Sequence, residues 1–205
     1  MCRTNPGNWL AIGLFALLIQ CAMGLLTVSV VGCRKQGQGQ EASAYDAHDF
    51  VAISTGWSHS LALKSDGSIV VRGDNRWGMA DPPDGNNFVA IAAGTYYSLA
   101  LKSDGSIVGW GLDSDGETHP PDGNDFVAIA TDGTYSLALK SDGSIVNWGN
   151  NKFSEARPPK GKDFVAIAAD RSHSLVLKSD GSIVGWGRNQ FGQADPPGGV
   201  TSLLL

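Results

Sequence analysis

Short apolar runs, separated by turn residues, recur along residues 49–205 in four copies that are 38 residues apart. Each copy contains three such runs, bounded by Gly, Asp and Ser. The first is Phe-Val-Ala-Ile (50–53, 88–91, 126–129, 164–167); the second is Ser-Leu-Ala-Leu-Lys, with Val176 for Ala in the last copy; the third is Ser-Ile-Val, followed in three copies by Trp-Gly. Runs of this length and composition predict β-strands. No helical period of apolar residues occurs beyond the N-terminus, so the repeats are expected to be all-β.

The second and third runs are joined by Ser-Asp-Gly-Ser in every copy. Asp in such a turn bonds its own backbone, and Gly accepts a positive φ, which together favour a hairpin. The two strands are therefore predicted to form an antiparallel pair.

Both faces of the predicted strands are uncharged. In the second run Leu61 and Leu63 point to one side, while Ser60 and Ala62 point to the other. A small sheet that is apolar on both faces must stack between copies of itself, which is the arrangement of β-propeller blades. We therefore expect an all-β propeller of four 38-residue, roughly three-stranded blades: 49–86, 87–124, 125–162 and 163–199, with a partial strand at 200–205. The ring is expected to be closed, open or completed by homo-oligomerisation.

Four motifs carry a resemblance to a known family: Val-Ala-Ile-Ala-Ala-Gly (89–94), His-Ser-Leu (173–175), Gly-Trp-Gly (185–187) and Asn-Gln-Phe-Gly-Gln (189–193). Together they resemble the regulator of chromosome condensation repeat superfamily. The short period is similar to that of its bacterial branch, which includes the propeller-type β-lactamase inhibitor protein. The resemblance covers residues 49–197 and implies protein–protein interaction. Members of this superfamily usually close a ring of seven blades, so four copies are a departure.

The N-terminus is apolar without charge from Trp9 to Gly32 and follows Arg3, a pattern that fits an export signal or a membrane-spanning helix. It ends in Val30-Val31-Gly32-Cys33, which resembles the lipobox of bacterial lipoproteins and implies that Cys33 is acylated. An uncleaved signal anchor and cleavage at another position are the alternatives. Residues 1–32 are expected to be the signal peptide or membrane anchor and 33–48 a flexible tether. All three alternatives export the repeats, and the lipoprotein and the signal anchor would attach them to the membrane of the cell envelope.

Charge and cysteine content exclude several kinds of site. The net charge of −5 gives no electrostatic case for nucleic-acid binding. All three cysteines lie in the first 33 residues, so the repeats can hold neither a thiolate nucleophile nor a cysteine metal site. We find no phosphate cradle, catalytic triad or zinc spacing, and we expect no cofactor, no metal and no enzymatic activity.

Variable residues gather at one rim of the predicted propeller, formed by the turn after the first strand and the link after the third. Aromatic and arginine side chains on a rigid scaffold favour a protein-binding surface. The candidates are Trp57, Arg76, Trp77, Tyr96, Phe153, Arg171 and Phe191. The alternative is that Trp77, Phe153 and Phe191 are tucked under their links as local plugs.

His59 and His173 occupy a position where the middle copies have Tyr97 and Tyr135. A metal or acid–base site between the first and fourth blades is one interpretation, and a ring that packs and hydrogen-bonds within each blade is the other. The sequence as a whole predicts an exported, membrane-tethered propeller that binds another protein, with inhibition or scaffolding of an envelope protein as its role. An extracellular hydrolase or lyase that uses the central pocket, or a degenerate fragment without a partner, are the alternatives.

Overall fold

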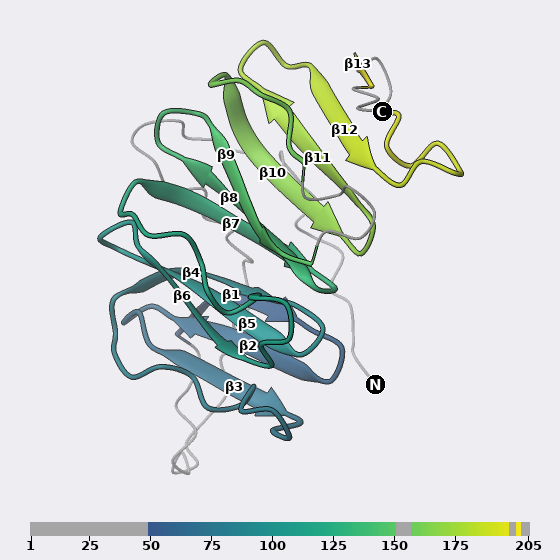
Figure 1. Ribbon diagram of the computed structural model, residues 1–205. Helices are drawn as coiled ribbons and strands as arrows, with labels where there is room; N and C mark the ends of the chain where they lie inside the picture. The colour runs from purple at the N-terminus through teal and green to yellow at the C-terminus, as the bar shows by residue number, and fades with distance from the viewer. Residues whose placement is uncertain (1–48, 151–156, 197–199, 202–205) are drawn as a thin grey trace, which may run out of the picture.

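A computed structural model describes residues 49–150, 157–196 and 200–201, and these residues form strands joined by turns and links (Figure 1). The first two sheets comprise β1 (Phe50–Thr55), β2 (His59–Lys64) and β3 (Ile69–Gly73), then β4 (Phe88–Ala93), β5 (Tyr97–Lys102) and β6 (Ile107–Gly111). The next two comprise β7 (Phe126–Asp132), β8 (Tyr135–Lys140) and β9 (Ile145–Gly149), then β10 (Phe164–Asp170), β11 (His173–Lys178) and β12 (Ile183–Gly187), with β13 (Val200–Thr201) at the edge. Within the described ranges there is no helix that could span a membrane. The predicted N-terminal helix, tether and Cys33 lie outside those ranges.

Each copy of the repeat is one antiparallel sheet whose strands follow chain order. In the first, Leu61 lies opposite Ser54 of β1 and Val71 of β3. A register shift at the second residue of each first strand, such as that between Phe50 and Ala52, marks a bulge. The predicted all-β fold of four three-stranded blades is therefore confirmed.

The Ser-Asp-Gly-Ser hairpins are held by their own polar residues. The Asp66 carboxylate accepts hydrogen bonds from the amide and hydroxyl groups of Ser68, at 2.9 and 2.7 Å, which lower the pKa of Asp66. Gly67 has a φ of 82°, and a Cβ at this position would lie 2.2 Å from the carbonyl oxygen of Asn86. Glycine is needed here both for the turn and for the close approach of the segment that leads into β4.

Each blade packs its leucine face on the first strand of the next. In the first interface Leu61, Leu63 and Val71 form one apolar cluster with Phe88, Ala93, Ala100 and Trp110 of the second blade. The same pairing recurs between the second and third blades and between the third and fourth. The predicted stacking of the sheets on one another is confirmed, and branched side chains of one blade contact alanines of the next.

The four sheets follow one another in chain order from β1–β3 to β10–β12 (Figure 1). Among the described residues, no apolar cluster joins the first blade to the fourth. β13 pairs in parallel with β12, on the outer edge of the fourth blade, through Val184↔Val200 and Gly185↔Thr201. The described residues of one chain thus form an open arc.

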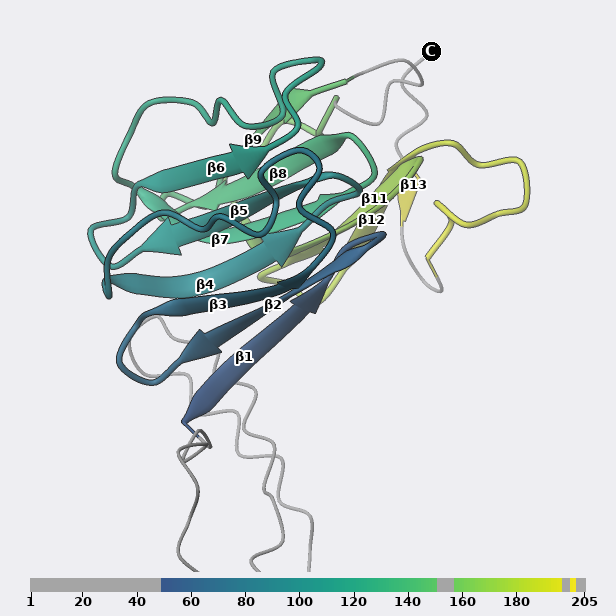
Figure 2. The same ribbon diagram turned by 90° about the horizontal axis from the view of Figure 1, so that it is seen from below.

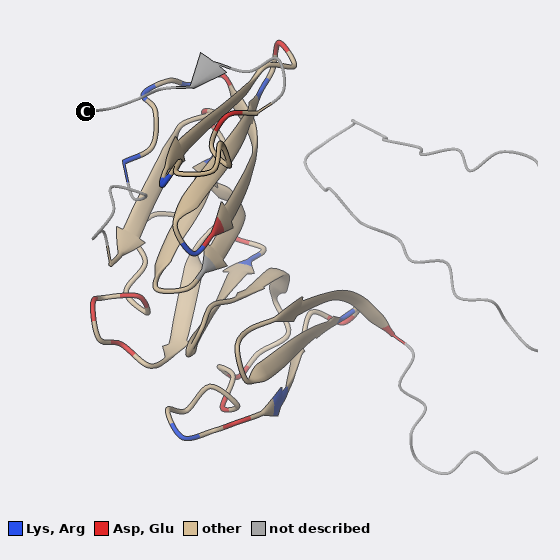
Figure 3. Cartoon of the chain, turned by 90° about the vertical axis from the view of Figure 1, so that its right-hand side faces the viewer, with Lys and Arg blue, Asp and Glu red and all other residues tan. Residues whose placement is uncertain are grey.

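Charged residues gather in the turns, the links and the ends of strands, whereas the middles of the strands carry none (Figure 3). The stacked sheets are therefore held together by apolar contact. This distribution leaves recognition of charged or polar partners to the two rims.

We predict that Leu99→Ala strongly destabilises all the blades together. Leu99 is fully buried between the second and third blades, and removal of a buried leucine side chain typically costs about 2–5 kcal/mol. Denaturant unfolding followed by circular dichroism would measure the change. The control Val127→Ala, at a residue 47% exposed, should change stability by about 0.5 kcal/mol or less. Equal losses for both variants would contradict a role for the interface.

Candidate functional site

The turns after the first strands and the starts of the links lie together at one rim. The amide of Asp74, where the first link begins, donates to the carbonyl of Ser58 in the preceding turn, at 2.9 Å. The later copies repeat this bond, for example from Leu112 to Tyr96 at 2.8 Å. Figure 2 shows why: the arrows of β1, β4 and β6 point to the same side, whereas β2 points back. The hairpins consequently lie at the opposite rim.

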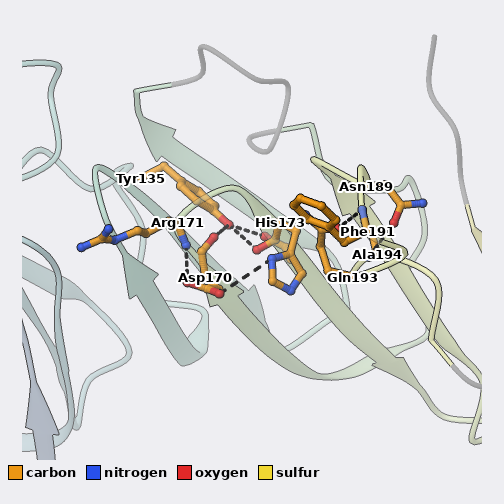
Figure 4. Close-up of polar contacts among 9 residues, drawn as sticks. Tyr135, Asp170, Arg171, His173, Asn189, Phe191, Gln193 and Ala194 are labelled. Atoms are coloured by element: carbon orange, nitrogen blue, oxygen red, sulfur yellow. Dashed lines mark hydrogen bonds and ion pairs between the residues drawn. The ribbon is translucent and has the colours of Figure 1, made fainter.

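Trp57 and Arg171 bring the first and fourth blades together at this rim. The guanidinium of Arg171 lies 4.9 Å from the centre of a Trp57 ring, although Trp57 remains 64% exposed. Figure 4 shows Arg171 pointing away from Asp170 and His173 of the same blade. The second and third blades meet nearby, where the amide of Thr95 donates to the carbonyl of Gly133 at 3.0 Å. Turns from all four blades therefore contribute to one surface.

Arg76 and Trp77 stand on the first link. The guanidinium of Arg76 forms an ion pair with Asp74 at 2.5 Å, and this contact raises the pKa of Arg76 and lowers that of Asp74. Arg76 is exposed and Asp74 is half-buried, so the pair orients the arginine side chain more than it stabilises the fold. Tyr96, half-buried, is close enough to Arg76 to contribute to its raised pKa. Trp77 is 51% exposed.

Phe191 extends into solvent from the last link, with 87% of its surface exposed. Its amide donates to Gln193 at 2.9 Å, and the side chain of Asn189 accepts from the amide of Ala194 at 2.9 Å (Figure 4). Asn75 makes the same contact with the amide of Ala80 in the first link, at 2.8 Å. Neither Trp77 nor Phe191 is tucked under its link, and Phe153 lies outside the described residues.

The residues that do fill the space under the links were not identified from the sequence. Met79 and Glu117 are both buried, with relative exposures of 0% and 3%. Their carbonyl oxygens accept hydrogen bonds from the indole nitrogens of Trp110 and Trp148, at 2.9 and 2.8 Å. The two residues are 38 positions apart and so occupy equivalent positions in the repeat. This equivalence was the signal that could have identified them from the sequence.

The His/Tyr position joins neighbouring blades. The Tyr97 hydroxyl bonds Ser136 at 2.8 Å, the Tyr135 hydroxyl bonds Ser174 at 2.6 Å, and Nε2 of His59 bonds Ser98 at 2.8 Å. The packing interpretation holds, with the correction that the bonds reach the next blade instead of staying within one. In the described part of the chain, no group of three or more His, Cys, Asp or Glu side chains is placed to hold a metal ion.

Taken together, the stacked three-stranded sheets and the rim of turns define a β-propeller repeat protein. Residues 50–76, 88–117 and 164–193 match the family model described as the regulator of chromosome condensation (RCC1) repeat. Three of the four copies of the repeat therefore match this repeat family. No curated protein matches it.

Solved propellers share the fold over about half of their own length. Prp20p from Saccharomyces cerevisiae is 21% identical, with a TM-score of 0.63 over 76% of this chain and 48% of that one. Human WBSCR16 is also 21% identical, with a TM-score of 0.60 over 68% and 47%. The ectodomain from the Arabidopsis thaliana receptor kinase ACR4 is 25% identical, with a TM-score of 0.58 over 67% and 50%.

We predict that stability falls as the pH drops below about 6.5 because of His59. Burial lowers the pKa of this side chain, against a smaller opposing effect of Asp74, and its Nδ1 has no hydrogen-bond partner among the described residues. Below the ordinary pKa of 6.5, the unfolded chain then binds more protons than the folded chain. The contribution of neutral, buried His59 to the free energy of unfolding is therefore complete above that pH and is lost as the pH falls below it.

His59→Tyr, which introduces the residue of the two middle blades, should flatten this dependence. One group contributes at most about 1.4 kcal/mol per pH unit. Urea unfolding between pH 5 and pH 8 would measure it, with the exposed His119→Gln as control. An unchanged slope in His59→Tyr would show that other groups are responsible.

Proposed function

We propose that this chain is an exported, membrane-tethered propeller that binds another protein through the rim of first-strand turns and links. The observation that carries the proposal is the display of large aromatic side chains on that rim. Trp57, Trp77 and Phe191 are 64%, 51% and 87% exposed, although each would gain free energy by burial. Trp and Arg are the residues most enriched at the energetic centres of protein interfaces.

The rim supplies specificity as well as apolar area. Arg76 is held by Asp74, and Arg171 is stacked on Trp57, so both guanidinium groups are oriented before a partner arrives. An ordered side chain loses less entropy on binding than a mobile one. A protein surface with acidic groups between apolar pockets would match this arrangement.

Related propellers support a protein as the partner. Yeast RCC1 (Prp20) has been crystallised bound to Kap60, and Prp20p has binding properties toward Gsp1p and histones. We transfer only the class of partner, because the net charge of −5 disfavours a nucleic-acid surface. The use of this fold in a receptor-kinase ectodomain supports an exported location. Inhibition or scaffolding of an envelope protein is the role we propose.

The binding surface can be tested by affinity capture with the full chain as bait. The rim variant combines Trp57→Ala, Trp77→Ala and Phe191→Ala; the control combines Val89→Ala, Val127→Ala and Val165→Ala, which are also exposed but lie on the first strands. We expect a partner that is retained by the wild type and the control and lost by the rim variant.

The affinity of the captured partner should then be measured with each purified chain. Loss of one central aromatic residue typically costs about 2 kcal/mol, which corresponds to roughly a 30-fold weaker Kd. Circular dichroism must show that the rim variant remains folded. Equal affinity for the rim variant and the control would refute the rim as the binding surface.

Membrane attachment through Cys33 requires a separate test. We expect the wild-type chain to incorporate a labelled fatty acid and to fractionate with membranes, whereas Cys33→Ser should lose the label because it lacks the thiol that is acylated. Cys21→Ser is the matched control and should retain the label. A wild-type chain that fractionates with membranes without label would favour the uncleaved anchor.

A further inference from the structure

The two ends of the arc expose the two halves of one interface. Inside the chain, the leucine face of each blade covers the Phe, Ile and Ala face of the next. Among the described residues, no blade precedes the first and none follows the fourth. Each end therefore presents the half that the other end lacks.

The exposed half on the first blade is apolar. Phe50 is 42% exposed, whereas the equivalent residues Phe88, Phe126 and Phe164 are each 3% exposed. Ile53 is 79% exposed, and its equivalents Ile91, Ile129 and Ile167 are half-buried. A contiguous apolar face of this kind is typical of an interaction site.

The fourth blade exposes the complementary half. Leu177 is 37% exposed, whereas its equivalents Leu63, Leu101 and Leu139 are at 2%, 3% and 4%. Leu175 is half-buried, although its equivalents Leu61, Leu99 and Leu137 are at 1%, 0% and 0%. The leucine face is thus present but uncovered.

The polar bonds between blades stop at the same two ends. The side chain at position 59, 97 or 135 is hydrogen-bonded to a serine of the next blade. These serines are at most 1% exposed: Ser98, Ser136 and Ser174. The fourth member of the series is His173, and the serine that no preceding blade covers is Ser60, which is exposed. A hydrogen bond between His173 of one chain and Ser60 of another would complete the series.

We propose that a second copy of this chain covers both end faces, so that the fourth blade of each copy packs on the first blade of the other and two chains form one eight-bladed ring. The chain already forms this interface three times within itself, which fixes its register and chemistry. Both faces are uncharged, so their burial carries little desolvation cost. Head-to-tail contacts form a closed ring when the rotation between successive chains sums to a full turn. With two chains, the ring contains two identical contacts.

The internal interfaces indicate where the two chains can be cross-linked. The amide of Ala93 donates to the hydroxyl of Ser54 in the preceding blade at 3.0 Å. By the 38-residue period, the corresponding residues at the ends of the arc are Ala168 and Thr55, both exposed. A cysteine at each position should form a disulfide between two chains.

The test mixes two full-length chains with different tags, one with Thr55→Cys and the other with Ala168→Cys, in detergent under mild oxidation. We expect a linked pair that contains both tags. Neither variant should form more linked product alone than the wild type, whose Cys2, Cys21 and Cys33 set the background. Because each chain carries one introduced cysteine, a bond within one chain cannot imitate this result. Absence of the mixed pair would overturn the proposal.

The mass of the complex provides an independent test that does not use cysteine. Native mass spectrometry of the full chain should give two chains, and Ile53→Glu should give one, since it places a charge on the face to be buried. Phe191→Glu, at an apolar residue on the rim that is at least as exposed as Ile53, should remain a pair. A single-chain mass for the wild type, or a pair that persists in Ile53→Glu, would overturn the proposal.

Other occupants of the end faces would give different results. If another segment of the same chain covers the first blade, the wild type will have the mass of a single chain. The introduced cysteine of the Thr55→Cys variant will then react slowly with a maleimide. If a different protein covers the first blade, the purified wild type will also have the mass of a single chain, but the cysteine of Thr55→Cys will react rapidly with the maleimide. Both outcomes refute the two-chain ring and leave the rim surface to be judged by its own experiment.

Discussion

The structure depends on the contact between the leucine face of one blade and the Phe, Ile and Ala face of the next. A 38-residue sheet that is apolar on both sides cannot bury enough surface by itself, so each blade is stable only beside a neighbour. Tyr97 and Tyr135 add hydrogen bonds across the same interfaces and thereby fix the register of the stack. Apolar burial supplies the free energy, and the buried hydroxyl groups specify how adjacent blades fit together.

The sequence was sufficient to predict the elements because the repeat shows the same local signals four times. Alternation of Leu61 and Leu63 with small residues located the leucine face, and Ser-Asp-Gly-Ser located the hairpins. The direction of the His59 and Tyr97 rings could not be predicted, since a period gives the position along a strand but not the neighbour that a side chain reaches. The structure places their partners on the next blade.

The candidate site could be predicted only in part, for a related reason. Variable residues mark the rim, but exposure depends on how each link is folded. Asn75 and Asn189 hold their links in a form that turns Trp77 and Phe191 outward, while Met79 fills the space below. A hydrophobic residue in a link can equally become a plug or a contact. The three-dimensional course of the link decides between these outcomes.

The rim and the stack are physically coupled through Trp57 and Arg171. These residues belong to the first and fourth blades, so the 4.9 Å contact between them depends on the relative rotation at all three intervening interfaces. A small change in one interface is transmitted along the arc and alters the spacing of the rim residues. Closure by a second copy would fix that rotation, because both end faces would then be held. The surface proposed to bind a partner would thus become more rigid in the assembled ring.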